Sequence, residues 1–265
     1  MASGIRKPSG RRRPAARVAP LWRAHLVMPT LLQRRRVYQY ARWSGRPVCH
    51  GFGTRGVSVE AYLRNAHEDS WSIPTTRQVH SPIAMDLTPP LPRMVLVADA
   101  FVTATPGVVC MVRTADCVPL LLYEPVRGVV AAIHAGWRGL AAGVIANTVQ
   151  LMCERFGGSV ARIEAAIGPA IRGAEYEVDR HVIEAMRAGG HDIAAGVLSR
   201  TGRGAATRWQ LDLPTLAWQA LLRSGIMPDA IGAADVSTVT HQGDFASFRR
   251  DELGSTRQVN WIALL

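Results

Sequence analysis

Lysine is almost absent from this chain, and acidic residues are absent from its beginning. Lys7 is the only lysine among 31 basic residues, and the first acidic residue is Glu60. Residues 1–42 hold eleven basic residues, whereas 20 arginines balance 20 acidic residues from residue 43 onward. The net charge of +11 is therefore a property of the N-terminal segment. We expect no nucleic-acid partner for the folded part, since such binding needs a basic surface.

Paired cysteines, a secretory signal and a long uninterrupted apolar run are also lacking. The four cysteines form no CxxC pair, and no apolar segment follows the N-terminus. The longest apolar stretch, Gly128 to Met152, contains His134 and Arg138, which excludes a membrane span because charge is costly inside a bilayer. We expect a cytoplasmic, reducing location. The arginine-rich, acid-poor start is also typical of an organelle transit peptide, and Met28 is an alternative start.

The remaining sequence predicts one mixed α+β domain over residues 46–265, preceded by a basic, disordered extension over residues 1–45. Short Val-, Ile- and Leu-rich runs separated by turn residues are typical of buried strands, and their close spacing favours antiparallel hairpins. The strands are expected at 94–98, 107–112, 118–123, 128–133, 163–167, 236–240, 246–248 and 258–264. Helices are expected at 139–156, 179–187 and 213–223, with Asp179 and Asp212 as N-caps.

Three short segments carry the residues most suited to chemistry, each at a strand end or turn. They are Gln78-Val79-His80, Thr114-Ala115-Asp116-Cys117 and His134-Ala135-Gly136-Trp137-Arg138-Gly139. Spacings of 37 and 17 residues between His80, Cys117 and His134 match no structural zinc pattern, where ligands come in close pairs. Two imidazoles and one thiolate nevertheless suit Zn²⁺ and also accept copper, and three protein ligands leave a fourth position for water or substrate. The sequence therefore predicts an open, catalytic metal site.

The third segment also favours anion binding. Gly136 and Gly139 flank Trp137-Arg138 where a strand passes into a helix. Free N–H groups at a helix start attract anions, and an arginine adds bidentate contacts. The alternative is that the glycines only permit a tight turn.

These segments resemble the signature of the multicopper polyphenol oxidase/laccase-like family, also called purine nucleoside phosphorylase-like or peptidoglycan editing factors. Further matches run in family order from residue 50 to the C-terminus. They are His50-Gly51-Phe52-Gly53-Thr54-Arg55, Ala98-Asp99-Ala100, Ile167-Gly168-Pro169-Ala170-Ile171, Tyr176-Glu177-Val178 and Ser247-Phe248-Arg249-Arg250-Asp251.

The resemblance implies a layered α/β/β/α fold with mixed sheets. It implies His80, Cys117 and His134 as metal ligands and catalytic residues, usually with zinc and with copper as the alternative. The implied activity is phosphorolysis of adenosine, inosine and methylthioadenosine, with adenosine deamination alongside. Purine nucleoside and phosphate would be the small-molecule partners, and Arg55, Arg138 and Arg249 are the candidate anion-binding residues.

The chain departs from the family pattern in three places. Arg55 and Gln78 are only 23 positions apart, about half the usual separation. Arg172-Gly173-Ala174-Glu175 stands where a cysteine usually precedes Tyr-Glu-Val, and Ser237-Thr238 replaces the usual Cys-Thr. The ligand set is retained, so metal binding is a firmer expectation than the choice of substrate.

Three other functions use the same residues. A copper-dependent phenol oxidase of the laccase type needs several coppers and many histidines, and this chain has eight. A metal-free hydrolase acting on peptidoglycan precursors would use Cys117 as nucleophile with His80 or His134 as base. A binding protein without turnover is the last alternative. No H-x-E segment of the better-known zinc deaminases occurs, and the sequence does not reveal the oligomeric state.

Overall fold

Two sheets stacked face to face form the centre of the molecule. The computed structural model describes residues 31–34, 36–66, 71–251 and 256–265. One sheet has six strands in the order β15-β11-β9-β10-β7-β5, and the other has five in the order β1-β2-β3-β16-β8. The first comprises β5 (Ala84–Asp86), β7 (Ala100–Thr103), β9 (Val118–Glu124), β10 (Val129–Ala135), β11 (Glu164–Ile167) and β15 (Ile231–Ala233). The second comprises β1 (Leu31–Arg34), β2 (Val37–Tyr40), β3 (Val48–Gly53), β8 (Cys110–Thr114) and β16 (Gln258–Leu264).

The six-stranded sheet is mixed, and both of its faces are covered. β9 pairs antiparallel with β10 and β11, whereas β11–β15 and β5–β7 are parallel pairs. Leu120 and Ile133 point into a core shared with helices, while Leu121 and Ala132 pack against the five-stranded sheet. Every residue of β9 and β10 is buried, which explains why these strands read as continuous apolar runs.

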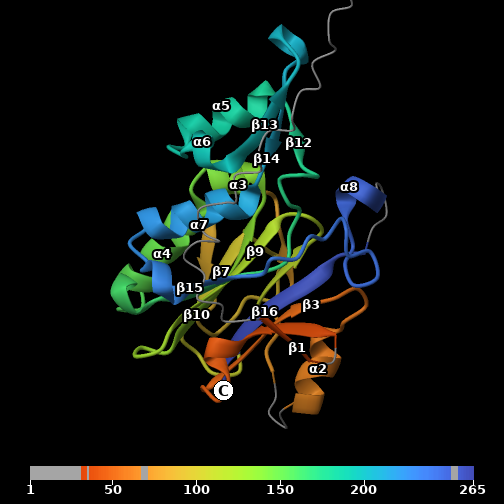
Figure 1. The fold of residues 1–265 in the computed structure, drawn as a ribbon. Coiled ribbons are helices and arrows are strands. Elements are labelled where there is room, and N and C mark those ends of the chain that lie inside the picture. Colours follow the sequence, from red (N-terminus) through yellow and green to blue (C-terminus); the bar gives the residue numbers. More distant parts are fainter. Residues whose placement is uncertain (1–30, 35, 67–70, 252–255) are drawn as a thin grey trace, which may run out of the picture.

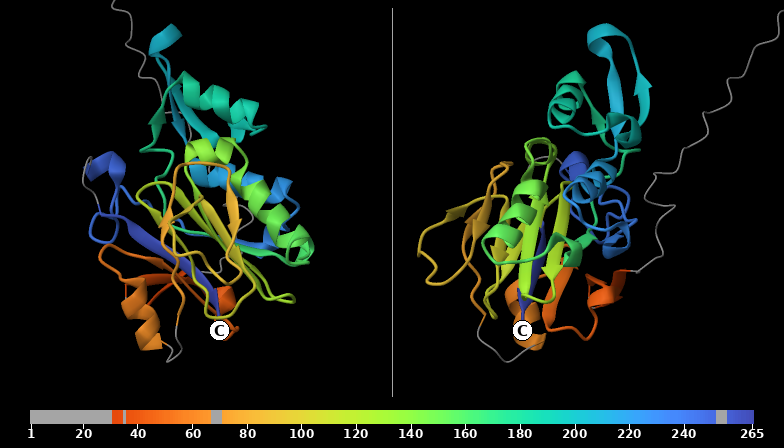
Figure 2. Two further views of the ribbon diagram at one scale, coloured as in Figure 1. Left: turned by 180° about the vertical axis from the view of Figure 1, so that it is seen from behind. Right: turned by 90° about the vertical axis from the view of Figure 1, so that its left-hand side faces the viewer.

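Helices complete the outer layers. α3 (Trp137–Ala141), α4 (Val144–Glu154) and α7 (Leu213–Arg223) lie on one side of β7, β9 and β10, and α2 (Val59–Ala66) lies beyond β3 and β16 (Figure 1). The expected α/β/β/α layering is confirmed. Apart from these layers, α5 (Arg180–Ala188), α6 (Ile193–Gly196), β12 (Glu177–Val178), β13 (Val197–Thr201) and β14 (Arg208–Leu211) form the upper part of the molecule (Figure 2). β4 (Thr76–Arg77) and β6 (Leu96–Val97) form a two-stranded parallel sheet, and α8 is Phe248–Asp251.

The folded part begins earlier than residue 46. Residues 31–34 and 37–40 form β1 and β2, and the side chains of Val37, Tyr40 and Trp43 are buried. These residues were expected to belong to the extension, because the arginines around them hide the apolar spacing. Residues 1–30 lie outside the described residues, so the extension expected there stays a prediction.

Several expected elements are confirmed. α7 and β16 occupy the predicted residues, and Asp179 and Asp212 accept N-cap hydrogen bonds from Val182 and Thr215. The single helix expected over 139–156 is wrong. It is two helices, because Gly143 adopts a left-handed conformation with φ +92° between them.

The hairpin expected between β8 and β9 is also wrong. β8 pairs with β16, whereas β9 belongs to the other sheet. Asp116, with φ +86°, lies in the turn that carries the chain from one sheet to the other.

The strands expected at 236–240 and 246–248 are absent. Ser237 closes a turn by accepting hydrogen bonds from the N–H groups of Val239 and Thr240, a local bond that competes with sheet pairing. Similarly, the Ser247 hydroxyl accepts from the N–H of Arg250 at the start of α8.

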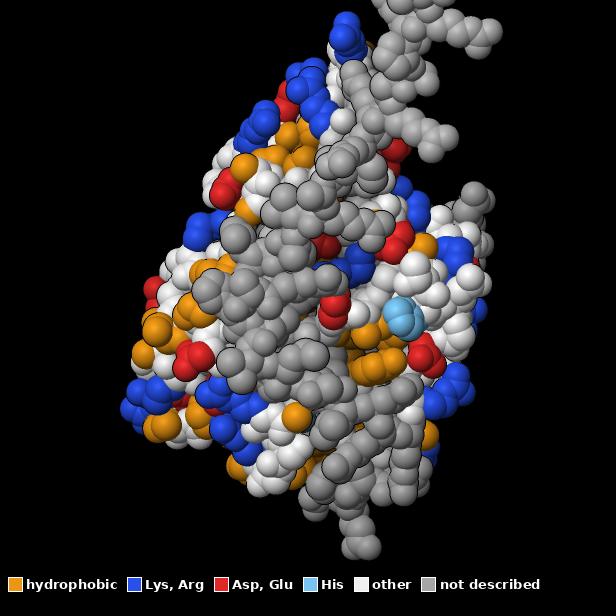
Figure 3. Space-filling view, viewed as in Figure 1, with side chains coloured by type: hydrophobic (Ala, Val, Ile, Leu, Met, Phe, Trp, Pro, Cys, Tyr) orange, Lys and Arg blue, Asp and Glu red, His pale blue; other side chains and the backbone are white. Residues whose placement is uncertain are grey.

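The surface shows no uniform basic face in the view of Figure 3. Basic side chains there are interspersed with acidic and apolar ones, consistent with balanced charge after residue 42. None of the helices in the described part of the chain is both long and apolar enough to span a bilayer.

Candidate metal centre and cavity

The β9–β10 hairpin brings Cys117 and His134 together. Its register pairs His134 with Pro119 and Ala135 with Val118, so Cys117 lies one residue before the last pair. His80 comes from the loop after β4. The donor atoms of His80, Cys117 and His134 lie within 4.8 Å of one another. Residues 37 and 17 positions apart in the sequence thus form one group, as predicted.

Asp99 holds both histidines of this group. Its buried carboxylate lies 2.8 Å from Nδ1 of His134, and its main-chain oxygen accepts from the N–H of the same residue. The carboxylate also accepts hydrogen bonds from the N–H groups of Val79, His80 and Ser81 and from the Ser81 hydroxyl. A histidine that donates Nδ1–H to a carboxylate presents Nε2 to a ligand.

The backbone of His80 is in the left-handed region, with φ +60°. A non-glycine residue is held there only where surrounding contacts outweigh the strain. The three N–H groups bound by Asp99 supply such contacts. The imidazole of His80 reaches the cavity, and its ring centroid lies 4.8 Å from that of His134.

Gly136 provides the space in which the three donors meet. A Cβ atom at this position would lie 2.7 Å from Cδ2 of His80 and 3.0 Å from Sγ of Cys117. Any larger residue would push the donors apart. Gly136 is therefore required by packing rather than by turn geometry alone.

The thiol and the buried imidazole form a polarised pair. Burial raises the pKa of Cys117, but hydrogen bonds from His134 and His80 outweigh it and lower the pKa below the usual value. Burial lowers the pKa of His134, but Asp99 and Cys117 together raise it. The group therefore favours a thiolate, which is the form that binds a metal or acts as a nucleophile.

The donor set fits a zinc ion. Zn–N bonds of about 2.0–2.1 Å and Zn–S bonds of about 2.3 Å place tetrahedral ligand atoms about 3.5 Å apart. Sγ of Cys117 and Nε2 of His80 are 3.9 Å apart. In the part of the chain that the structure describes, this is the only group of three or more potential ligands gathered in this way.

Asp116 links Cys117 to the C-terminal Ser-Phe-Arg-Arg segment. Its carboxylate accepts hydrogen bonds from the hydroxyls of Thr238 and Ser247 and from the N–H of Arg249. Thr238, in the segment that departs from the family pattern, thus has a structural contact. The carboxylate is fully engaged and is a positioning group.

The donors line a cavity of about 650 Å³, a volume in the range of small-molecule sites. Aromatic residues Trp137, Tyr176 and Phe248 line one part of it. Burial, reinforced by the nearby Cys117 thiolate, raises the pKa of Tyr176, so its hydroxyl stays protonated. A cavity is thus present although only 23 positions separate Arg55 from Gln78.

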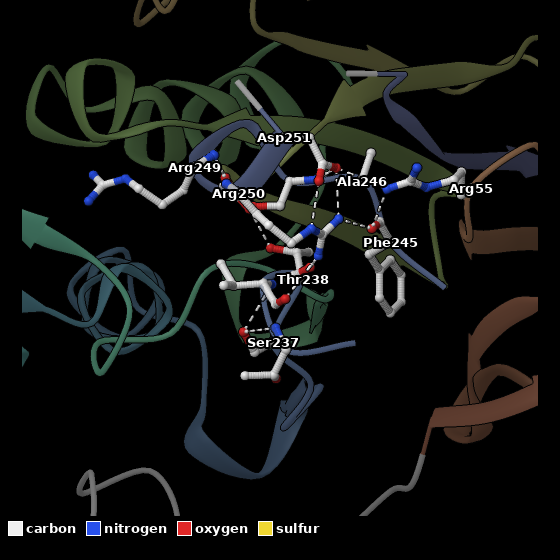
Figure 4. Close-up of polar contacts among 12 residues, drawn as sticks. Arg55, Ser237, Thr238, Phe245, Ala246, Arg249, Arg250 and Asp251 are labelled. Carbon is white, nitrogen blue, oxygen red and sulfur yellow. Dashed lines mark hydrogen bonds and ion pairs between the residues drawn. The ribbon is translucent and has the colours of Figure 1, made fainter. Parts of the chain in front are cut away.

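The three arginines expected to bind anions are placed differently. Arg138 and Arg249 line the cavity; Arg138 lies 4.3 Å from the Trp137 ring centroid and Arg249 5.2 Å from that of Tyr176. Arg55 does not line it. The Arg55 guanidinium binds the carboxylate of Asp251 and the carbonyl of Phe245 (Figure 4).

Figure 4 also separates the two adjacent arginines of the C-terminal segment. The side chain of Arg249 extends away from the cluster, whereas that of Arg250 turns into it. Arg250 donates to the carbonyls of Thr238, Val239 and Phe245 and pairs with Asp251. Arg250 therefore holds the loop together and leaves Arg249 facing the cavity.

Sequence reasoning missed several residues of this site. Asp99 and Asp116 were noted only as parts of motifs, although an acidic residue between buried apolar neighbours is a signal for a bound partner. Arg77, Arg113 and Arg257 line the cavity and carried no sequence signal. The anion site expected at the helix start stays a prediction, and the helix there, α3, has only five residues.

A stacked-sheet fold with an open His/Cys/His group beside a cavity defines a class of candidate metal-dependent enzymes. Residues 58–265 match the family model described as multi-copper polyphenol oxidoreductase laccase. The chain belongs to this family.

Curated relatives are purine enzymes by name. The chain is 34% identical over 166 residues to a purine nucleoside phosphorylase of Bacteroides thetaiotaomicron, covering 63% of this chain and 60% of the relative. It is 43% identical over 153 residues to one of Deinococcus radiodurans, covering 58% and 56%. Adenosine deaminase RL5, from an unknown prokaryotic organism, is 35% identical over 164 residues, covering 62% and 61%. The alignments thus span less than two thirds of these relatives.

A solved structure matches over a longer range. The Bacillus licheniformis hypothetical protein YfiH superimposes with a TM-score of 0.81 at 26% identity, covering 89% of this chain and 99% of that one. Neisseria meningitidis protein NMB0706 gives a TM-score of 0.69 at 27% identity, covering 82% and 94%. Both agree with the mixed layered fold.

Proposed function

We propose that this chain is a zinc-dependent purine nucleoside enzyme. It would catalyse phosphorolysis of adenosine, inosine and methylthioadenosine, with adenosine deamination alongside. The observation that carries the proposal is the open His80–Cys117–His134 group at the edge of a cavity lined by aromatic and arginine side chains. The names of the curated relatives support the substrate class.

His80, Cys117 and His134 would hold the zinc. When bound, it would supply Lewis-acid polarisation and activation of a water molecule near neutral pH. Asp99 orients the His134 imidazole and fixes the backbone of His80 through the hydrogen bonds described above.

The remaining lining residues suit phosphorolysis. An oxygen of phosphate attacks the anomeric carbon, the bond from that carbon to the purine nitrogen breaks, and the purine leaves with a proton. Arg138 and Arg249 would bind the phosphate, since guanidinium groups match its geometry. Trp137 and Phe248 would contact the flat base, and the protonated Tyr176 hydroxyl would donate a hydrogen bond to it. Deamination differs, since water displaces the amino group as ammonia.

The decisive experiment incubates zinc-loaded protein with adenosine, with and without phosphate, and follows products by chromatography. Phosphate-dependent adenine supports phosphorolysis, and inosine supports deamination. Absence of both products from metal-loaded protein would leave the binding protein without turnover as the better account.

A metal-free cysteine hydrolase is the second candidate, because the lowered pKa of Cys117 and the raised pKa of His134 are also typical of a nucleophile and its base. Metal content and alkylation separate it from the zinc enzyme. Purified protein without metal, whose Cys117 is alkylated rapidly, would favour this hydrolase. A copper-dependent phenol oxidase would instead contain several coppers and show blue absorbance.

A further inference from the structure

The cavity carries more positive charge than the proposed reaction uses. Five arginines line it, namely Arg77, Arg113, Arg138, Arg249 and Arg257, against one acidic residue, Asp116. The Asp116 carboxylate already accepts hydrogen bonds from the hydroxyls of Thr238 and Ser247 and from the backbone N–H of Arg249. A nucleoside is neutral, and Arg138 and Arg249 suffice for inorganic phosphate. Three cationic side chains remain to be explained.

These three arginines come from β4, β8 and the residue before β16, whereas the aromatic lining residues Trp137, Tyr176 and Phe248 come from α3, the segment before β12 and α8. Arg113 lies on β8, and the Gln78 side chain holds its backbone by two hydrogen bonds of 2.8 Å, one donated and one accepted. Arg77 precedes Gln78 in the chain. Arg257 precedes β16, whose first residue, Gln258, pairs with Thr114 at the end of β8. We call Arg77, Arg113 and Arg257 the arginine wall.

The arginine wall has no described ion-pair partner. Among residues 31–34, 36–66, 71–251 and 256–265, no carboxylate lies within ion-pair distance of its three side chains. The hydrogen bond from Ser58 lowers the pKa of Glu60, and the charge of Arg113 makes a smaller contribution in the same direction. However, the Glu60 carboxylate accepts a hydrogen bond from Ser58 and is outside the lining. Arginines without an ion-pair partner among the described residues give a concave site a positive potential, which attracts an anionic ligand.

We propose that the arginine wall binds a phosphate group carried by the substrate itself, so that the preferred substrate is a purine nucleoside monophosphate. The inference rests on the proposed purine activity. In such a nucleotide the ribose separates the base from its 5′-phosphate. The base would contact Trp137 and Phe248, while the 5′-phosphate would reach the separate arginine wall. Arg138 stays available for inorganic phosphate, as do the N–H groups of Arg249 that its hydrogen bonds to the Glu177 carbonyl leave unused.

Calorimetry on the full-length, zinc-loaded chain tests the proposal with adenosine and adenosine 5′-monophosphate as ligands. Charge-assisted hydrogen bonds from arginine should make the monophosphate bind about tenfold tighter or more. Arg113→Gln and Arg257→Gln should each reduce that affinity ratio several-fold. Arg203→Gln, a change of the same type in an exposed residue outside the cavity lining, should leave the ratio as in the wild type. Added salt should weaken the monophosphate selectively.

The outcomes separate this inference from the function on which it rests. Equal affinity for the two ligands, or a ratio unchanged in both glutamine variants, overturns the arginine wall as a substrate subsite even if adenosine is converted. Glutamine variants that raise the KM for inorganic phosphate and leave the ratio unchanged would assign these arginines to the co-substrate instead. Binding of neither ligand would overturn both the inference and the purine activity.

Discussion

Replacement of Asp99 by asparagine should weaken metal binding, because the Asp99 carboxylate holds the His80 backbone and the His134 ring in place. The carboxylate is fully buried and accepts from Val79, His80, Ser81 and His134. Asparagine keeps one acceptor oxygen and replaces the other by an NH₂ group. If its oxygen faces His80 and His134, the N–H groups of Val79 and Ser81 lose their acceptor.

The magnitude follows from those two groups. A fully buried N–H without a partner costs about 1–3 kcal/mol. Because both of these hydrogen bonds are only part-buried, Asp99→Asn should lower the free energy of unfolding by about 1–3 kcal/mol in total. Loss of the partner that orients a metal-binding histidine typically costs about 10–100-fold in metal affinity. Both effects should occur together, because the same carboxylate fixes the His80 backbone and the His134 ring.

Urea denaturation and zinc competition with a chelator measure the two quantities. Asp86→Asn is the matched control, since Asp86 is half-buried and pairs with the exposed Arg155 and Thr88. It should cost about 1 kcal/mol or less and leave zinc affinity intact. An Asp99→Asn protein with wild-type zinc affinity would refute the assigned role of this carboxylate.

Two further predictions concern packing and pH. Gly136→Ala should lower zinc affinity by at least about tenfold, since the added Cβ would meet His80 and Cys117 at 2.7 and 3.0 Å. Gly243→Ala, where a Cβ meets nothing within 4 Å, should leave zinc affinity as in the wild type. Equal zinc affinity in the two variants would contradict the packing argument. Burial lowers the pKa of His50 to about 4, below its value in the unfolded chain, so its contribution to stability is complete above pH about 6.5 and is lost as the pH falls towards 4. Between pH 7 and 4.5 this loss should approach about 2.5 kcal/mol. In urea denaturation, the free energy of unfolding of His50→Gln should fall over this pH range by that amount less than the free energy of unfolding of the wild type. The same fall in both proteins would show that His50 is not the titrating group.

The sequence predicted those features that depend on local patterns or on ordered motifs. Asp212 and the apolar spacing after it define α7, and the short, mostly apolar run over 258–264 defines β16. The motifs around His80, Cys117 and His134 predicted a group that spacing alone left as isolated residues. The structure brings the three together because the β9–β10 register fixes two of them and Asp99 fixes the third.

Other features depend on tertiary contacts that no local pattern shows. β8 (Cys110–Thr114) and β9 (Val118–Glu124) are both mostly buried strands, and nothing in either sequence says that they belong to different sheets. Arg113 lines the cavity because Gln78, 35 residues away, holds its backbone there. Arg55 is also an arginine in a motif that matches the family, yet its guanidinium binds the Asp251 carboxylate and does not line the cavity.

Zinc content of the purified chain tests the central claim most directly. We predict one zinc per wild-type chain and loss of zinc in both Cys117→Ala and His134→Ala. Cys153→Ala, a matched change in a cysteine outside the donor group, should retain it. Full zinc retention in both Cys117→Ala and His134→Ala would contradict the assignment of these residues as ligands and, with it, the proposed centre of the chemistry.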